Sequence, residues 1–181
     1  MKMKGTAYLA RKKIVIEKFG QPAWDAFIAE TAEAVPFLAS PVMATTGIAL
    51  QDFITFQEAL VTRFYKGNVR AYWDFGAASA EWSLTEGPYR ASLAKRDLKS
   101  LVETFPGLWS NYYDAGEMIA TITDQVVHIR VVKLPLWHLS FEMMAMGYFA
   151  RALELYLKRK VASKRIVGGV PGPELHYAFY V

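Results

Sequence analysis

The spacing of apolar residues changes once along this chain, at Gly116, and that change limits the folds that the chain can adopt. Before Gly116, apolar residues recur every three or four positions, as they do on one face of an α-helix. In 118–133 two β-rich runs flank Thr123-Asp124-Gln125, which predicts a β-hairpin. The sequence therefore predicts an α+β fold, with an N-terminal helical half followed by a small antiparallel sheet.

The helical half is predicted to contain several separate helices. The strongest signal covers 50–65, where Phe53, Phe56, Leu60 and Phe64 repeat at intervals of three and four. Further helices are expected at 7–19, from Pro22 onward, at 69–82 and at 88–103.

The first of these helices is expected to be amphipathic. Its apolar residues lie among basic ones and are Leu9, Ile14, Ile16 and Phe19, interspersed with Arg11, Lys12, Lys13 and Lys18. Gly20 is expected to end it.

The sheet half is expected to contain the hairpin, a long helix at 140–160 and two final strands at 164–168 and 174–181. Ser140 is a favourable N-cap for that helix. A length of 181 residues suits a single core, so one domain is expected. Its parts are a mainly helical 1–115 and a sheet part, 116–181, crossed by the long helix.

The absence of cysteine excludes several chemistries. The chain can form no disulfide, thiolate nucleophile, thiolate-bound metal site or thioester. Lysine and arginine exceed aspartate and glutamate by 21 − 17 = 4, a mild excess that does not indicate a nucleic-acid partner. The N-terminus has no apolar signal segment, and the longest nearly apolar run, 143–150, is too short to span a bilayer. A cytoplasmic protein without a transmembrane segment is therefore expected.

No motif indicates an enzyme. The sequence has no nucleophile elbow, Walker loop or GxGxxG motif, and the segment "GGVPGP" before the last strand is expected to be a turn. None of the histidines, His128, His138 and His176, has a second ligand at a metal-binding spacing. Glu142 lies at the start of the long helix, where the helix dipole accounts for it. No catalytic residue, metal site or cofactor is predicted.

Two apolar groups could form either core or a ligand pocket. The stretch 104–118 contains Phe105, Trp109, Tyr112 and Tyr113 before Gly116, and the long helix carries a methionine-rich face around Gly147. Methionine fills irregular space and adapts to varied apolar partners.

Gly147 is expected to mark a close approach, either of the helix to the sheet or of a ligand to the helix. Replacement by alanine is expected to cost little, and replacement by leucine to be destabilising. The basic cluster at 158–165 is expected to be a solvated edge or, alternatively, a patch for acidic headgroups or an acidic partner.

The N-terminus resembles the start of haem-nitric-oxide/oxygen-binding (H-NOX) domains, through Lys4-Gly5, Phe19-Gly20 and Trp24. The C-terminal third is similar to 4-vinyl-reductase and TRAPP-like ligand-binding domains at Gly147, Gly172, Phe179 and Val181. The middle looks closest to an uncharacterised paralogous family expanded in myxobacteria. The shared residues are Gly76, Gly87-Pro88-Tyr89-Arg90, Leu93, Pro106, Leu108-Trp109, Tyr112-Tyr113 and Gly116.

The departures from these families bear on function. H-NOX domains hold haem through a histidine on a helix before the sheet and through a Tyr-x-Ser-x-Arg motif. This chain has no histidine in 91–127 and no such motif. TRAPP-like relatives carry an acyl chain on cysteine, and Tyr177 stands at the position of the last cysteine of vinyl-reductase domains.

The resemblance implies a non-enzymatic, haem-free ligand-binding or sensory module. Its pocket for a hydrophobic small molecule or lipid would lie between the long helix, the sheet and the helical half. The expected lining is Trp109, Tyr113, Met143, Met144 and Gly147. The alternative is a protein-interaction scaffold whose core is filled by these aromatics. A homodimer and a signalling protein are the partners considered.

Overall fold

The computed structural model describes residues 1–181, and it confirms the predicted α+β fold. The chain forms two compact units, Met1–Ala71 and Tyr72–Val181. The first unit is mainly helical, and the second contains the four-stranded sheet with its own helices. The single domain expected over 1–181 stays a prediction.

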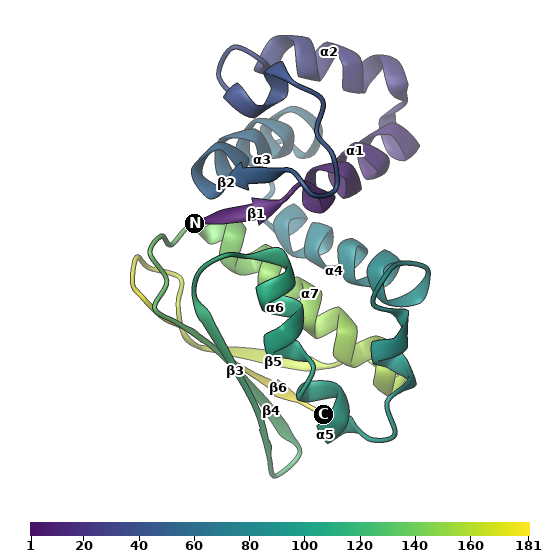
Figure 1. The fold of residues 1–181 in the computed structure, drawn as a ribbon, viewed down its shortest axis with the longest axis vertical. Helices are drawn as coiled ribbons and strands as arrows, with labels where there is room; N and C mark the ends of the chain where they lie inside the picture. Colours follow the sequence, from purple (N-terminus) through teal and green to yellow (C-terminus); the bar gives the residue numbers. More distant parts are fainter. The chain divides into compact units, whose positions relative to one another are not determined.

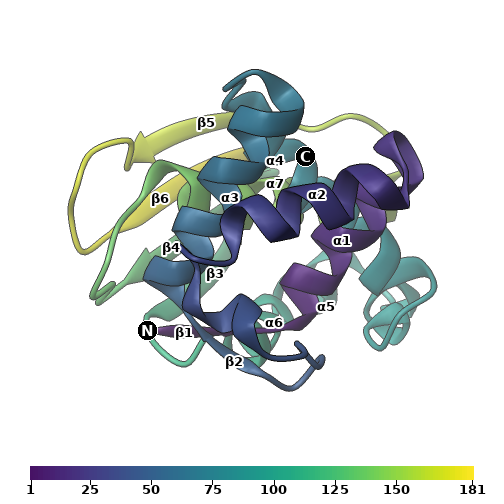
Figure 2. The same ribbon diagram turned by 90° about the horizontal axis from the view of Figure 1, so that it is seen from above.

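Three helices dominate the first unit. They are α1 (Thr6–Phe19), α2 (Gln21–Thr31) and α3 (Leu50–Tyr65), with a short 3-10 helix at Pro36–Ala39 (Figure 2). Gly20, at φ 89°, separates α1 from α2 as expected. The unit also has a sheet that the sequence does not predict, in which β1 (Lys2–Lys4) pairs antiparallel with β2 (Gly47–Ala49). Strands of three residues are too short to show an alternating pattern.

The packing of α1 differs from its sequence pattern. Arg11 is fully buried, whereas Leu9 and Phe19 are 36% and 37% exposed. The Arg11 Nε donates a hydrogen bond to Oε1 of Gln57 on α3, at 3.2 Å. This buried acceptor, 46 positions away in the sequence, helps to explain why a cation occupies the inward face of the helix.

The second unit begins within α4 (Arg70–Thr85). The prediction of a single helix at 88–103 is wrong. The segment instead forms a 3-10 helix at Arg90–Ala94 and α5 at Leu98–Val102, with extended backbone at Lys95 between them. Asp97 caps α5, because its Oδ1 accepts a hydrogen bond from the Ser100 N–H at 2.7 Å.

The aromatic run and the sheet follow. α6 covers Phe105–Tyr112, and the sheet has the strand order β3-β4-β6-β5 with all neighbours antiparallel (Figure 1). Its strands are β3 (Glu117–Thr123), β4 (Val126–Val132), β5 (Ala162–Val167) and β6 (Leu175–Tyr180). The predicted hairpin is confirmed. Asp124 and Gln125 form its two-residue turn with positive φ angles of 49° and 61°.

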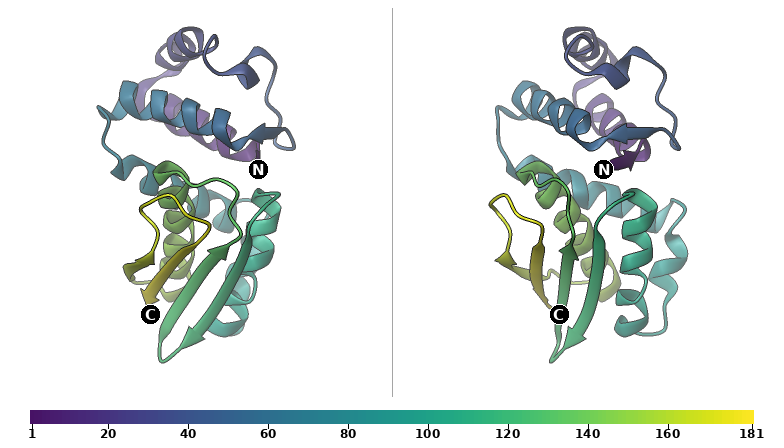
Figure 3. Two further views of the ribbon diagram at one scale, coloured as in Figure 1. Left: turned by 90° about the vertical axis from the view of Figure 1, so that its left-hand side faces the viewer. Right: turned by 60° about the vertical axis from the view of Figure 1, so that its left-hand side comes forward.

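Three helices of this unit cover one face of the sheet, called here the inner face. α5 and α6 contact β3, and α7 (Leu139–Leu157) contacts β6 (Figure 3). Val127, Ile129 and Val131 of β4 point to the inner face and are fully buried. His128 and Arg130 point to the opposite, outer face, as the alternation of a strand requires.

The N-cap residue of α7 differs from the one expected. His138, not Ser140, is the N-cap, because the His138 ring accepts a hydrogen bond from the Ser140 N–H. Ser140 is already inside the helix, and its side chain is fully buried. The helix ends at Lys158, which adopts a left-handed conformation at φ 55°.

The backbones of α4 and α7 approach each other directly at two glycines. A Cβ atom on Gly147 would lie 3.0 Å from the carbonyl carbon of Trp73 on α4 and closer still to its oxygen. A Cβ atom on Gly76 of α4 would lie 2.9 Å from both the Met144 carbonyl carbon and the Tyr148 nitrogen. A close approach at Gly147 is therefore confirmed, but the expectation that the sheet is the neighbouring element is wrong, because the neighbour is α4.

This contact changes the expectation for alanine at Gly147. The obstructing atoms belong to backbone, which cannot rotate away as a side chain could. We therefore expect Gly147→Ala to destabilise the protein by about 1–3 kcal/mol in spite of its better helix propensity. Urea unfolding measures this. Gly107→Ala in α6 is the matched control, since no atom lies within 4 Å of its added Cβ. It should stabilise by roughly 0.5–1 kcal/mol. Equal stability of Gly147→Ala and wild type would contradict the contact.

Candidate functional site

Trp109 and Tyr113 of the predicted lining meet at the end of α6. Their ring centroids are 4.4 Å apart, and Phe141 of α7 packs against both rings at 5.8 and 5.3 Å. The Trp109 Nε1 donates to the carbonyl oxygens of Ala115 and Gly116, each at 3.2 Å. The Trp109 ring is only 2% exposed, whereas Tyr113 is half-buried. Trp109 thus anchors the turn that leads into β3.

The ring contacts continue through tyrosines on both helices. Tyr112 contacts Tyr148 of α7 at 5.6 Å and Tyr89 at 5.8 Å between ring centroids. The Tyr148 hydroxyl hydrogen-bonds Ser83 of α4 at 2.8 Å. Burial, reinforced by the neighbouring Tyr112, raises the pKa of Tyr148 far above its usual value of 10.0. The Tyr148 hydroxyl is therefore an uncharged hydrogen-bonding group at neutral pH.

The methionine-rich face divides into buried and accessible parts. Met144 and Met146 are 5% and 0% exposed, whereas Met143 is half-buried. Gly147 packs on α4, as described above. The structure thus brings Trp109 and Tyr113 together, and places Met143, Met144 and Gly147 on the first half of α7. Contact of these five residues with a ligand stays a prediction.

Glu142 is the centre of a buried polar cluster that the sequence does not indicate. Its carboxylate is fully buried and accepts hydrogen bonds from the Tyr177 hydroxyl at 2.6 Å and from the Trp137 Nε1 at 2.7 Å. The Gly169 N–H donates to it at 2.7 Å, and the Arg165 Nε lies 2.7 Å from its Oε1. The helix dipole is therefore a minor part of what stabilises this carboxylate.

The glycines of the β5–β6 connection fit around this carboxylate. A Cβ on Gly168 would lie 2.8 Å from Glu142 Oε1, and Gly169 adopts φ 79° while donating its N–H. Burial and the hydrogen bond to Glu142 raise the pKa of Tyr177 well above its usual value of 10.0. The cluster ties β5, β6, their connection and the segment before α7 to one helix end.

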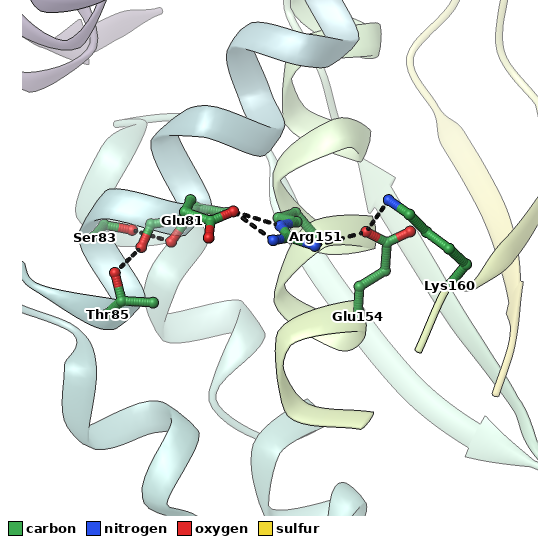
Figure 4. Close-up of polar contacts among 7 residues, drawn as sticks. Glu81, Ser83, Thr85, Arg151, Glu154 and Lys160 are labelled. Carbon is green, nitrogen blue, oxygen red and sulfur yellow. Dashed lines mark hydrogen bonds and ion pairs between the residues drawn. The ribbon is translucent and has the colours of Figure 1, made fainter. Parts of the chain in front are cut away.

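A charged groove of about 410 Å³ lies at the other end of α7. It is lined by Arg151, Glu154, Leu155, Lys158, Arg159 and Lys160. The Arg151 side chain lies between Glu81 of α4 and Glu154 (Figure 4). Its Nε donates to Glu81 at 2.7 Å, and Lys160 donates to Glu154 at 3.2 Å. The exposed Lys158 and Arg159 add positive charge, and contact of this end of the 158–165 cluster with an acidic partner stays a prediction.

The histidines occupy two separate places. His138 caps α7, and its Nδ1 lies 2.9 Å from the Ser140 hydroxyl. His128 and His176 meet on the outer face of the sheet, with 3.1 Å between Nδ1 of His128 and Nε2 of His176. No histidine has a second ligand at a metal-binding spacing in the sequence, and the fold brings these two histidines together from distant positions. These residues are 48 positions apart, so no sequence spacing could reveal the pair.

No helix combines the length and the apolar character that a membrane span requires.

Solved structures of H-NOX proteins share this fold over nearly the whole chain. The H-NOX protein from S. oneidensis, in the Fe(II)NO ligation state, matches with a TM-score of 0.75 at 12% sequence identity. The match covers 98% of this chain and 98% of that chain. The Fe(II) unliganded H-NOX protein from K. algicida matches with a TM-score of 0.71 at 12% identity, over 98% of this chain and 96% of that one. No protein-family model matches the sequence, and no curated protein matches it.

The residues of this chain do not fit a histidine-ligated haem of the kind that the fold implies. The helix before the sheet is α6, and its sequence, FPGLWSNY, contains no histidine. His138 is engaged at the start of α7, and His128 and His176 lie on the face of the sheet that the helices do not cover. Cysteine, another haem ligand, is absent from the chain.

The buried cluster around Glu142 predicts that a nearly isosteric replacement of this residue lowers the stability of the protein strongly. Glu142→Gln keeps the shape of the side chain but removes its charge and turns an amide NH₂ toward hydrogen-bond donors. We expect a loss of about 2–4 kcal/mol in the free energy of unfolding, measured with urea. Glu117→Gln is the matched control. It removes an ion pair with Lys133 whose side chains are 60% and 72% exposed, and it should cost at most about 1 kcal/mol. Equal losses in the two variants would contradict the role of the cluster.

Proposed function

We propose that this protein is a non-enzymatic ligand-binding or sensory module that works without haem. The observation that carries the proposal is the match of nearly the whole chain to the fold of H-NOX proteins, two of which are described with iron in a defined ligation state. The lack of a histidine on α6 favours an occupant other than a histidine-ligated haem. We also propose that the chain is related to TRAPP-like and 4-vinyl-reductase domains and to the myxobacterial family.

The proposed ligand is a hydrophobic small molecule or lipid, bound without a covalent bond. Tyr113 and Met143 are the accessible members of the lining, since both are half-buried. Trp109 and Met144 are buried. Gly147 allows α7 to pack closely against α4. Tyrosine and methionine side chains both suit contact with an apolar ligand of irregular shape. No cysteine is present to form a thioester with such a ligand.

Signalling would follow from ligand binding. A ligand that contacts Tyr113 and Met143 would favour one arrangement of α6 relative to α7, and so alter a surface that a protein partner contacts. The partner is expected to be a second copy of the chain or a signalling protein.

A second candidate function is a protein-interaction or dimerisation scaffold without any ligand. The burial of Trp109 and Met144 favours it, because both side chains already have packed neighbours. In this case the aromatic residues of α6 would only pack in the hydrophobic core and would contact no ligand.

Ligand binding can be tested on protein purified from cells. Native mass spectrometry followed by organic extraction should reveal a co-purifying apolar molecule. In a thermal-shift screen of fatty acids, isoprenoids and tetrapyrroles, a true ligand at one hundred times its dissociation constant should stabilise the fold by about 2.7 kcal/mol. Met143→Trp should abolish the shift by filling the accessible space.

Met43→Trp is the control for that variant, since Met43 is 65% exposed and belongs to the first unit. It should leave the shift intact. Met144→Trp is less informative, because Met144 is 5% exposed and a larger ring there would overpack the protein with or without a pocket. A tight dimer that carries no adduct, and that no compound class stabilises, would refute the ligand-binding proposal in favour of the scaffold.

A further inference from the structure

His128 and His176 form a close pair on the outer face of the sheet. The Nδ1 atom of His128 lies 3.1 Å from the Nε2 atom of His176, and the ring centroids are 5.3 Å apart. Both side chains are half-buried, so solvent and ions reach them. The two strands that carry them are hydrogen-bonded neighbours inside the sheet, which fixes the positions of their backbones.

The strand register explains why the rings meet. His176 of β6 is directly opposite Arg130 of β4, and His128 is directly opposite Ala178. The histidines are therefore diagonal neighbours on one face. Ala178, opposite His128, has only a methyl group as its side chain, and the centroids of the two imidazole rings are 5.3 Å apart.

The spacing of the two nitrogens matches that of two ligands on one metal ion. Zinc–nitrogen bonds are about 2.0–2.1 Å long, so two nitrogens on a tetrahedral ion are roughly 3.3 Å apart. We propose that His128 and His176 bind a divalent transition-metal ion such as Zn²⁺ or Cu²⁺, through Nδ1 of His128 and Nε2 of His176. Imidazole nitrogen is a preferred ligand of both ions.

The charges around the pair are compatible with a bound cation. Arg130 is the charged residue that lies opposite His176 in the strand register. Glu174 offsets much of the charge of Arg130, whose Nε and Nη2 lie 2.8 and 2.7 Å from its Oε1. No cluster of three or more metal-ligating side chains occurs in the structure. Water would therefore complete the coordination of the ion.

The chain has only three histidines, so NMR can identify the bound nitrogens directly. Long-range ¹H–¹⁵N spectra of the full chain would be recorded during a Zn²⁺ titration at pH 7.5. The expected result is a shift of the Nδ1 signal of His128 and the Nε2 signal of His176, with saturation at one equivalent. Both signals of His138 should stay unchanged.

Isothermal titration with Zn²⁺ provides a second readout with matched variants. His128→Asn and His176→Asn should each weaken binding about tenfold or more, because each removes one of the two ligands. His138→Asn should bind Zn²⁺ as wild type does, and asparagine is also a good N-cap for α7. Zn²⁺ should raise the melting temperature of wild type but not that of His176→Asn. The proposal is refuted if a variant that carries both His128→Asn and His176→Asn binds Zn²⁺ as tightly as wild type, or if Nε2 of His128 and Nδ1 of His176 give the signals of metal-bound nitrogens instead.

Discussion

The direct contact between the backbones of α4 and α7 is the constraint on which the second unit depends. Gly76 and Gly147 each face backbone atoms of the other helix, and no larger residue could occupy either position without moving one of the helices. The Ser83–Tyr148 hydrogen bond and the Glu81–Arg151 ion pair continue the same contact along α7. This spacing determines where α7 presents its methionines and where its first turn meets the sheet.

At that first turn, Glu142 connects α7 to the sheet. A carboxylate without solvent contact requires hydrogen-bond donors, and Tyr177, Trp137, Arg165 and the Gly169 N–H supply them from segments that flank α7 in the sequence. The helix before the sheet, α6, contains no histidine, and its Trp109 is buried. The chain thus has the fold of H-NOX proteins without a histidine on this helix.

The α+β class and the strongest elements can be predicted from the sequence because their signals are local. The helix over 50–65 and the β-hairpin after Gly116 depend on periodicity and turn residues, and both are found as predicted. The sequence did not predict contacts that join distant residues. The buried Arg11 depends on Gln57 of α3, and the pairing of His128 with His176 depends on the register of β4 and β6. Neither contact leaves a pattern in the neighbouring sequence.

The central claim is that this chain keeps the H-NOX-like fold without a histidine-ligated haem. A haemin titration of the purified protein, followed by visible absorption spectroscopy in the oxidised and reduced states, tests it most directly. We expect only the broad absorption of unligated or loosely associated haemin, unchanged when His128, His138 and His176 are replaced one at a time. A sharp, stoichiometric Soret band that disappears on replacement of any one of these histidines would contradict the claim.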